Sequence, residues 1–288
     1  MTNQETNKKK VRIAAIQMAS GPVVSANLSE AERLISQSVK AGAGLIVLPE
    51  NFALMGMSER DKLKIREPEG SGHIQEFLSE QARRHRIWLV GGTIPLQAND
   101  VNKVRAACLL FDDKGQQRAR YDKTHLFDVQ LVEQGEKYVE SETIEAGDAV
   151  VVVDTPFGRL GLAVCYDLRF PELFRSMLNQ GVDIIALPSA FTATTGKAHW
   201  ETLVRARAIE NLSYLVAAGQ GGYHVNGRES HGDSMIVDPW GNILDRLVSG
   251  SGFVIAEYDP ANLTRIRRNF PALSHRKLLC NIDSIKSE

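Results

Sequence analysis

The chain has 288 residues, and its 34 basic residues nearly balance its 35 acidic ones, so it has no overall electrostatic footprint for nucleic acid or an anionic membrane. Without a run of about 18 apolar residues, no membrane span is expected. The three cysteines are odd in number and widely spaced, which argues against a disulfide framework and against a Cys-x-x-Cys metal site.

The chain is predicted to form one domain. Its length alone suggests two domains of roughly 150 residues, but no linker, repeat or low-complexity tract divides it. We expect a disordered polar N-terminus at residues 1–10, an α/β domain over 11–275 and a C-terminal tail at 276–288. Residues 1–10 contain no apolar core of a secretory signal. Together with the cysteine usage, this favours a cytoplasmic location.

The first half alternates strands with amphipathic helices. A buried strand is predicted at Val11–Met18. Asn27, followed three residues later by Glu30, predicts the cap of a helix that ends at Gly42. The following elements are predicted next: strands at Leu45–Leu48, Ile87–Ile94, Arg105–Phe111 and Gln117–Tyr121, a helix at Ile74–Arg84, and a long polar loop over residues 124–148. Ordered loops of that length are often functional.

The second half repeats this pattern. Its predicted strands are Val150–Asp154, Leu160–Val164, Ile184–Leu187, Tyr214–Ala218, Ser234–Asp238, Ile243–Leu247 and Gly252–Tyr258, and its predicted helices are Leu168–Gln180, Ala198–Asn211 and Asn262–Arg268. Leu45–Glu50 is similar to Ile184–Ser189, and each follows a helix that ends in glycine. Two αβ halves packed sheet to sheet would produce this echo, although so short a match can also arise by chance.

Three segments place a polar residue where a strand ends. In Leu162–Glu172 the strand leads into Cys165 and a helix pattern follows, so backbone amides and the helix dipole are predicted to stabilise a thiolate. Glu50 ends a second apolar run, at the edge where α/β sheets place their sites. Lys123 lies in a third segment, Tyr121–Asp128. Together they are predicted to supply a nucleophile, a proton-transferring base and an oxyanion clamp.

Competing interpretations apply to the other cysteines and to two histidines. Most cysteines in apolar strands are inert packing, and Cys108 and Cys280 are given that interpretation. His125 or His199 could instead pair with Cys165 and activate its thiol in a papain-like manner. Nothing around the cysteine resembles the local sequences of such proteases.

No sequence pattern indicates a metal or an organic cofactor. His224 and His231 are not part of a metal-binding spacing and are predicted to be satisfied polar residues. Gly219–Gly222 is too short to cradle a phosphate and is predicted to form a tight turn. The basic cluster Arg265–Arg268 is predicted to be a solvated helix face.

Taken together, the three strand-end segments resemble the nitrilase superfamily of carbon–nitrogen hydrolases. Leu-Pro-Glu at Glu50, Lys-Thr-His-Leu-Phe-Asp at Lys123 and Cys-Tyr-Asp-Leu-Arg-Phe-Pro-Glu at Cys165 match the motifs of its Glu-Lys-Cys triad, in the family's order. Asp238–Gly241 adds to the match, and the resemblance extends from residue 11 to about 275. It implies a four-layer α-β-β-α sandwich, and homodimers or higher homo-oligomers joined through helices near the site.

Within the superfamily, Cys-Tyr-Asp-x-Arg is similar to the branch of deaminated glutathione amidases and ω-amidases. This likeness implies that Arg169 meets a substrate carboxylate and that Phe191 and Thr195 line the same pocket. The segment that contains Thr195 and His199 resembles the deaminated glutathione amidases more than the ω-amidases, as do Tyr223–His224 and Arg228–Ser234, and His199 is predicted to bind the substrate. Glu140 matches a second glutamate that many members carry in the loop after the lysine.

The resemblance implies an enzyme that needs no cofactor and hydrolyses a linear amide of a small carboxylate-bearing substrate through a thioester. The Lys123 ammonium and the Tyr166 backbone N–H would hold the oxyanion. Deaminated glutathione amidase is ranked first. The alternatives are an ω-amidase acting on 2-oxoglutaramate, a hydrolase of N-carbamoyl amino acids or aliphatic amides, an inert scaffold of the same fold, and a redox-sensing cysteine. The intact triad argues against the scaffold, and the distant cysteines against the redox sensor.

Overall fold

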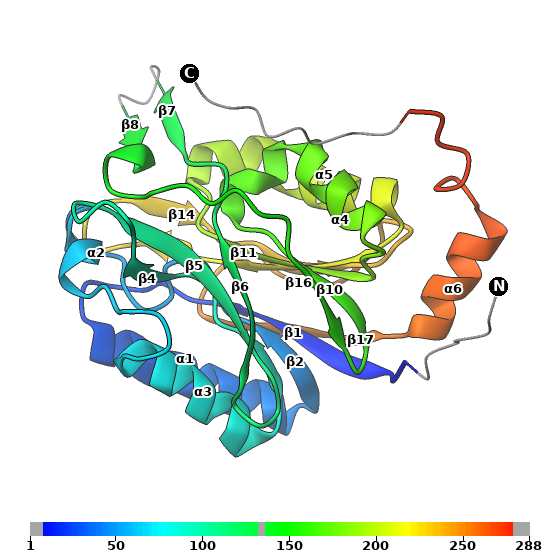
Figure 1. Cartoon of the computed structure of the whole chain (residues 1–288), viewed down its shortest axis with the longest axis horizontal. Coiled ribbons are helices and arrows are strands. Elements are labelled where there is room, and N and C mark those ends of the chain that lie inside the picture. Colours follow the sequence, from blue (N-terminus) through cyan, green and yellow to red (C-terminus); the bar gives the residue numbers. More distant parts are fainter. Residues whose placement is uncertain (1–7, 132–135, 279–288) are drawn as a thin grey trace.

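The computed structural model describes residues 8–131 and 136–278. Two β-sheets face each other, and helices cover the outer face of each sheet (Figure 1). Helices α1 (Val24–Lys40) and α3 (His73–His85) pack on the first sheet, and α4 (Pro171–Asn179) and α5 (Ala193–Asn211) on the second. The chain therefore has the expected α-β-β-α sandwich.

The first sheet has the strand order β17-β1-β2-β3-β5-β4, with β6 also paired to β5. Its strands are β1 (Val11–Gln17), β2 (Ala43–Val47), β3 (Trp88–Val90), β4 (Ile94–Gln97), β5 (Val104–Phe111), β6 (Gln117–Asp122) and β17 (Gly252–Tyr258). Strands β1, β2 and β3 run parallel. Their carboxyl ends therefore meet at one edge, where ligand sites form in such sheets.

The second sheet has the order β16-β15-β12-β11-β10-β9. Its strands are β9 (Val152–Thr155), β10 (Gly158–Leu162), β11 (Ile184–Ser189), β12 (Tyr214–Gly219), β15 (Ser234–Val237) and β16 (Ile243–Leu247). Strands β10, β11 and β12 are parallel. They are covered on both faces, which explains why β11 and β12 are apolar almost throughout.

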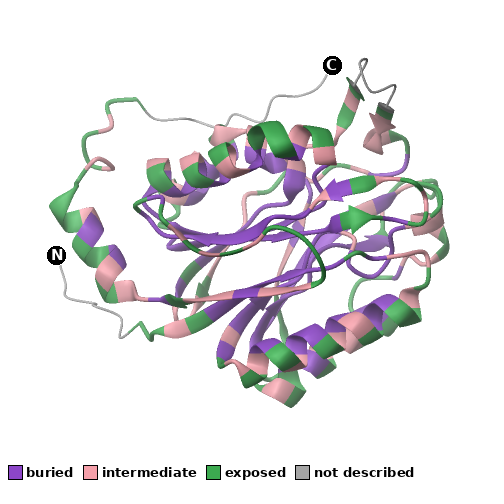
Figure 2. Cartoon of the chain, turned by 180° about the vertical axis from the view of Figure 1, so that it is seen from behind, coloured by how far each residue is buried: buried purple, intermediate pink, exposed green. Residues whose placement is uncertain are grey.

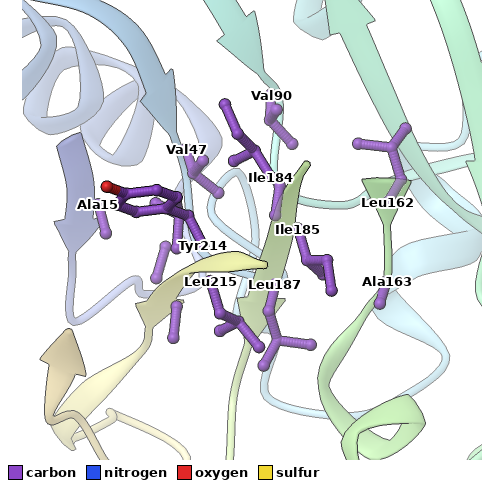
Figure 3. Close-up of a cluster of buried hydrophobic side chains, with 14 of the residues drawn as sticks. Ala15, Val47, Val90, Leu162, Ala163, Ile184, Ile185, Leu187, Tyr214 and Leu215 are labelled. Atoms are coloured by element: carbon purple, nitrogen blue, oxygen red, sulfur yellow. The ribbon is translucent and has the colours of Figure 1, made fainter. Parts of the chain in front are cut away.

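The main core lies between the sheets. Val47 and Val90 of the first sheet pack with Leu162, Ile184 and Leu215 of the second (Figure 3). Successive residues of a strand point to opposite faces, so the alternate residues of β2 build a second core under α1 and α3. Figure 2 shows the result: buried residues fill the sheets and the inner helix faces, and exposed residues line the outer helix faces.

The two similar segments of the sequence end strands that face each other. Leu45–Glu50 begins inside β2 and extends beyond its end, Ile184–Ser189 is β11, and the two strands are in contact across the sandwich. Each half thus sends an apolar strand toward the same end of the molecule.

Two predictions in the first half are wrong. Helix α1 begins at Val24, so Asn27 is not its cap; the Asn27 side chain instead bonds to Gly21 and to the Ala53 carbonyl oxygen. The single strand predicted at residues 87–94 is divided into β3 and β4. Gly92 separates them with a φ of 58°, and a Cβ there would lie 2.1 Å from the backbone oxygen of the residue before Glu50.

The predicted 124–148 loop contains unpredicted structure. A hairpin is formed by β7 (Asp128–Leu131) and β8 (Glu136–Val139), and a 3-10 helix, Glu140–Glu142, follows. A second hairpin, β13 (Gly221–Tyr223) with β14 (Glu229–His231), replaces the tight turn predicted at residues 219–222. These strands are too short for an apolar alternation to be visible in the sequence.

Differences at other helix boundaries have local causes. Helix α5 begins five residues before the predicted start because Thr192 caps it, and a short helix, α2 (Asp61–Lys64), was not predicted. Helix α6 (Pro260–Asn269) carries the basic cluster, but Arg267 is only partly exposed and pairs with Asp183 at 2.9 Å. Over residues 8–131 and 136–278, no helix has the length and apolar character needed to cross a membrane. Cys280 lies outside the described residues.

Candidate active site

Glu50, Lys123 and Cys165 converge on the floor of one cavity of about 250 Å³. Glu50 lies just beyond β2, Lys123 directly follows β6, and Cys165 lies just beyond β10. Their exposed fractions are 2%, 1% and 7% respectively. Ends of strands from both sheets thus bring a carboxylate, an ammonium and a thiol together, and Glu140 joins them in the same cavity.

Two carboxylates hold the Lys123 ammonium. Its Nζ donates to Glu50 Oε1 at 2.8 Å and to the two oxygens of Glu140 at 3.0 and 2.8 Å. Burial alone would lower the pKa of Lys123, but Glu140 and Glu50 outweigh that effect and raise the pKa well above its ordinary value. The lysine therefore stays charged and fixed in place.

Glu140 is itself fixed by a backbone donor. The Phe127 N–H donates to Glu140 Oε2 at 2.8 Å. Burial raises the pKa of this carboxyl, but the charge of Lys123 and then that of Lys62 lower it below its ordinary value overall. Glu140 thus remains an anion that supports Lys123.

Cys165 opens a five-residue 3-10 helix, Cys165–Arg169. Its φ is 47°, in the left-handed region that side-chain-bearing residues seldom adopt and that recurs at functional sites. The predicted stabilisation of a thiolate by backbone amides is outweighed in the folded site. Burial, and after it the charge of Glu50, raise the pKa of the thiol well above its ordinary value. Lys123 and the Ala190 N–H act in the opposite direction, but do not outweigh them. The resting sulfur is a protonated thiol beside a carboxylate.

Tyr166 is the second residue of the 3-10 helix. A backbone N–H at this position has no intrahelical partner, so it is available to an oxygen bound next to the Cys165 sulfur. The Tyr166 side chain lines the cavity.

The outer wall carries arginine and aromatic residues. Arg169, Phe191 and Thr195 line the cavity, as the resemblance implied. The Arg169 guanidinium carbon lies 5.3 Å from the centre of the Phe191 ring and 5.8 Å from that of Tyr166. His199 is not among the lining residues; its Nδ1 lies 3.2 Å from Arg169 Nη1, where it can orient the arginine.

Comparisons with known proteins identify the family of the chain. The family model described as carbon-nitrogen hydrolase matches residues 12–268. The chain belongs to the carbon-nitrogen hydrolase family. A relative from Synechocystis sp., named deaminated glutathione amidase, is 44% identical over 266 residues, covering 91% of this chain and 97% of that protein. The protein of the same name from Homo sapiens is 38% identical, covering 92% and 82%.

A solved structure with the same fold is the Saccharomyces cerevisiae member of branch 10 of the nitrilase superfamily. It has a TM-score of 0.84 and 31% sequence identity, and the match covers 94% of this chain and 97% of that chain. This carbon–nitrogen hydrolase is thus an enzyme for carbon–nitrogen bonds other than peptide bonds.

The hydrolase does not pair a histidine with its cysteine as a papain-like site would. His125 Nδ1 lies 2.7 Å from Asp167 Oδ1, and its ring stacks on Phe170 with centroids 3.8 Å apart. Asp167 also accepts from Val164 N–H at 2.8 Å and Tyr121 O–H at 2.7 Å. Asp167 therefore ties the segment of Lys123 to the turn of Cys165, a role that the sequence analysis missed.

The sequence analysis also missed part of the cavity wall. Arg228, Asn226 and Tyr138 line it, and they come from the two hairpins that were not predicted. The resemblance marked the segment that begins at Arg228 but gave it no role in the cavity, since the position of these residues depends on how the hairpins fold over the sheet ends. In the described part of the hydrolase, no three His, Cys, Asp or Glu side chains are grouped to hold a metal ion.

Proposed function

We propose that this hydrolase cleaves a linear amide with a carboxylate in its acyl half, and that deaminated glutathione is its substrate. The observation that supports this most is the floor of the cavity, where Glu50, Lys123 and Glu140 form a buried ion cluster beside the Cys165 thiol. The relatives named deaminated glutathione amidase favour this substrate.

In the first half-reaction the thiol becomes a nucleophile as it reacts. The raised pKa of Cys165 means that a free thiolate is scarce, so Glu50 takes the proton while sulfur attacks the amide carbon. The Lys123 ammonium and the Tyr166 N–H stabilise the oxyanion, each such donor contributing about 3–4 kcal/mol. Glu50 then returns the proton to the amine as the carbon–nitrogen bond breaks, which leaves a thioester.

In the second half-reaction water hydrolyses the thioester. Glu50, once more a carboxylate, removes a proton from water as its oxygen attacks the thioester carbon. The same two donors hold the second oxyanion. The carbon–sulfur bond breaks, sulfur regains a proton from Glu50, and a carboxylic acid leaves. Glu140 takes no proton in this scheme; it holds Lys123 in position.

Arg169 supports the choice of an acidic acyl half. Its guanidinium lies on the cavity wall beside Phe191 and makes no ion pair with a carboxylate among the described residues. A bidentate pair with a substrate carboxylate would satisfy it. An ω-amidase acting on 2-oxoglutaramate would use the same pair, and it is the second candidate function.

The deciding experiment compares turnover of deaminated glutathione, 2-oxoglutaramate and an N-carbamoyl amino acid by the purified protein. The proposal expects the highest kcat/KM for deaminated glutathione, and a quenched reaction should show a 2-oxoglutaryl group on Cys165 by mass spectrometry. Faster turnover of 2-oxoglutaramate would favour the ω-amidase, and a carbamoyl adduct would overturn both.

We further propose a homodimer in the cytoplasm. The large apolar side chains of Ile209 and Trp240 are exposed near α5, where a second copy would cover them. Cys108 and Cys165 are both free thiols, as a reducing compartment favours. Light scattering on the purified protein tests the dimer, and fractionation of cells tests the compartment.

A further inference from the structure

The cavity has a second arginine that the mechanism does not use. Arg228, in the loop between β13 and β14, lines the cavity together with Arg169. Its Nη2 donates to the Ala190 carbonyl oxygen, and its guanidinium carbon lies 5.4 Å from the centre of the Tyr138 ring. Its Nε is buried and has no hydrogen-bond partner among the described residues. A buried donor without a partner is costly, and it calls for an acceptor that the protein does not supply.

The protein holds this arginine in place before any ligand binds. The backbone N–H of Arg228 donates to Asn226 Oδ1 at 3.0 Å, and the backbone carbonyl oxygen of Arg228 accepts from the backbone N–H of His224 at 2.8 Å. His224 is in turn fixed to the Ser20 carbonyl oxygen at 2.8 Å and to the Ser230 hydroxyl at 2.9 Å. A preorganised guanidinium loses little freedom when it binds an anion.

The charges around the outer cavity favour an anion with more than one carboxylate. Among the described residues of the lining, and apart from the paired Glu50 and Glu140 of the floor, Arg169, Arg228 and Lys137 stand against one carboxylate, that of Glu59. Glu59 is already paired with Lys62 at 2.6 Å. Neither arginine forms an ion pair with a carboxylate in the described part of the chain. Two separate guanidinium groups are thus left for the ligand.

We propose that Arg228 binds a second substrate carboxylate, the one on the amine half of the scissile amide. The inference rests on the proposed function, which assigns Arg169 to the carboxylate of the acyl half. Deaminated glutathione has a carboxylate on each side of the amide, on the 2-oxo acid and on the terminal glycine. 2-Oxoglutaramate has only the first, because its leaving group is ammonia. Arg228 is thereby the residue that favours the secondary amide of deaminated glutathione over the primary amide of 2-oxoglutaramate.

The first test compares two substrates in one variant. Arg228→Gln is expected to lower kcat/KM for deaminated glutathione about 10- to 100-fold, the range for a lost charge-assisted hydrogen bond. For 2-oxoglutaramate the change should stay within about twofold. Arg12→Gln is the matched control, since Arg12 also donates to a backbone carbonyl but lies away from the cavity. An equal loss for both substrates would overturn the inference, because Arg228 would then act through Ala190 on Cys165.

The second test does not depend on turnover. Calorimetry on the Cys165→Ala protein compares the binding of deaminated glutathione with that of the same compound carrying a terminal carboxamide. The acid should bind about 10- to 100-fold tighter, and adding Arg228→Gln should abolish that difference. An unchanged ratio, or binding of neither compound, would overturn the role of Arg228. Preferred turnover of 2-oxoglutaramate by the native protein would instead overturn only the first-ranked substrate.

Discussion

The floor and the outer wall of the cavity use charge in opposite ways. On the floor, Lys123 is paired with Glu50 and Glu140 at 2.8 Å each; Lys123 and Glu50 are buried, and the Glu140 side chain is 14% exposed. On the wall, Arg169 and Arg228 contact aromatic rings and have no carboxylate partner among the described residues. The charged groups of the floor therefore neutralise one another without a ligand, whereas the arginines of the wall need an anionic ligand as their partner.

This difference assigns catalysis to the floor of the cavity and the choice of substrate to its wall. Buried ions cannot rearrange cheaply, so the floor keeps its geometry through the reaction and lowers the barrier by preorganisation. Partly exposed arginines can exchange water for substrate, so the wall determines which amide is held. Changes on the floor should therefore reduce kcat and stability, and changes on the wall should act mainly on KM.

The largest effect is expected from Cys165→Ala. Removing the nucleophile should reduce turnover by at least about 10⁴-fold, because no thioester can form. The fold should be retained, as circular dichroism and the denaturation midpoint would show. Full activity in this variant would end the proposed mechanism.

Lys123→Met should affect both rate and stability. It leaves the buried Glu50 and the partly exposed Glu140 without their counter-ion, which costs about 3–5 kcal/mol in the free energy of unfolding. Loss of an oxyanion donor should also lower kcat by about 10²–10³-fold. Urea titrations measure the first effect and initial rates the second, with Arg169→Gln as a wall control expected to change stability by less than about 1 kcal/mol. Equal stability of the two variants would contradict the contrast between floor and wall.

The stability of the Lys123→Met variant should also depend on pH differently from that of the native protein. In the native protein the lowered pKa of Glu140 adds stability that is complete above its ordinary value of 4.5 and is lost as the pH falls through the folded-state pKa. Without Lys123 that contribution disappears. The stability gap between native and Lys123→Met protein should therefore be widest at neutral pH and should narrow below about pH 4. A gap independent of pH would show that Glu140 is not stabilised by Lys123.

Arg169→Lys should produce a smaller effect, confined to binding. The planar fork is lost while the charge remains, so KM for a carboxylate-bearing amide should rise about 10-fold, with kcat little changed. Steady-state kinetics at one pH suffice. An unchanged KM would remove Arg169 from substrate recognition, and a fall in kcat alone would assign it to the floor.

The smallest effect concerns the thiol itself. Because burial and Glu50 raise the pKa of Cys165, its alkylation by iodoacetamide should keep accelerating beyond pH 9.0, the ordinary value for a thiol. Glu50→Gln removes a nearby negative charge and should move the rate profile to lower pH. Labelling is followed by mass spectrometry at this cysteine. A plateau near neutral pH would show that the site holds a thiolate at rest.

The floor could be located from the sequence, and much of the wall could not. Glu50 and Cys165 follow apolar runs, and parallel strands bring their carboxyl ends to one edge, so the pattern itself indicates that these two meet. Lys123 follows the polar, antiparallel strand β6, and only its motif, taken together with the other two, placed it in the site. Arg228 and Tyr138 belong to hairpins whose strands are only three or four residues long. Such strands carry no periodic signal, and long-range packing decides where they lie.

The protonation state of the Cys165 thiol could not be predicted from the sequence either. A cysteine before a helix start predicts a stabilised thiolate, but the helix that follows is a 3-10 turn of five residues, and the burial of the thiol outweighs it. Pair distances and desolvation are properties of the folded protein. The order of residues shows which groups converge, and the packing determines their protonation.

The left-handed backbone at Cys165, with its φ of 47°, restricts how the enzyme could be re-engineered. A β-branched side chain is strongly disfavoured in that conformation. Serine could replace the sulfur with a hydroxyl at little steric cost, whereas threonine would have to unwind the turn that carries it. An oxygen nucleophile at this position is therefore compatible with the backbone as the primary alcohol of serine, but not as the secondary alcohol of threonine.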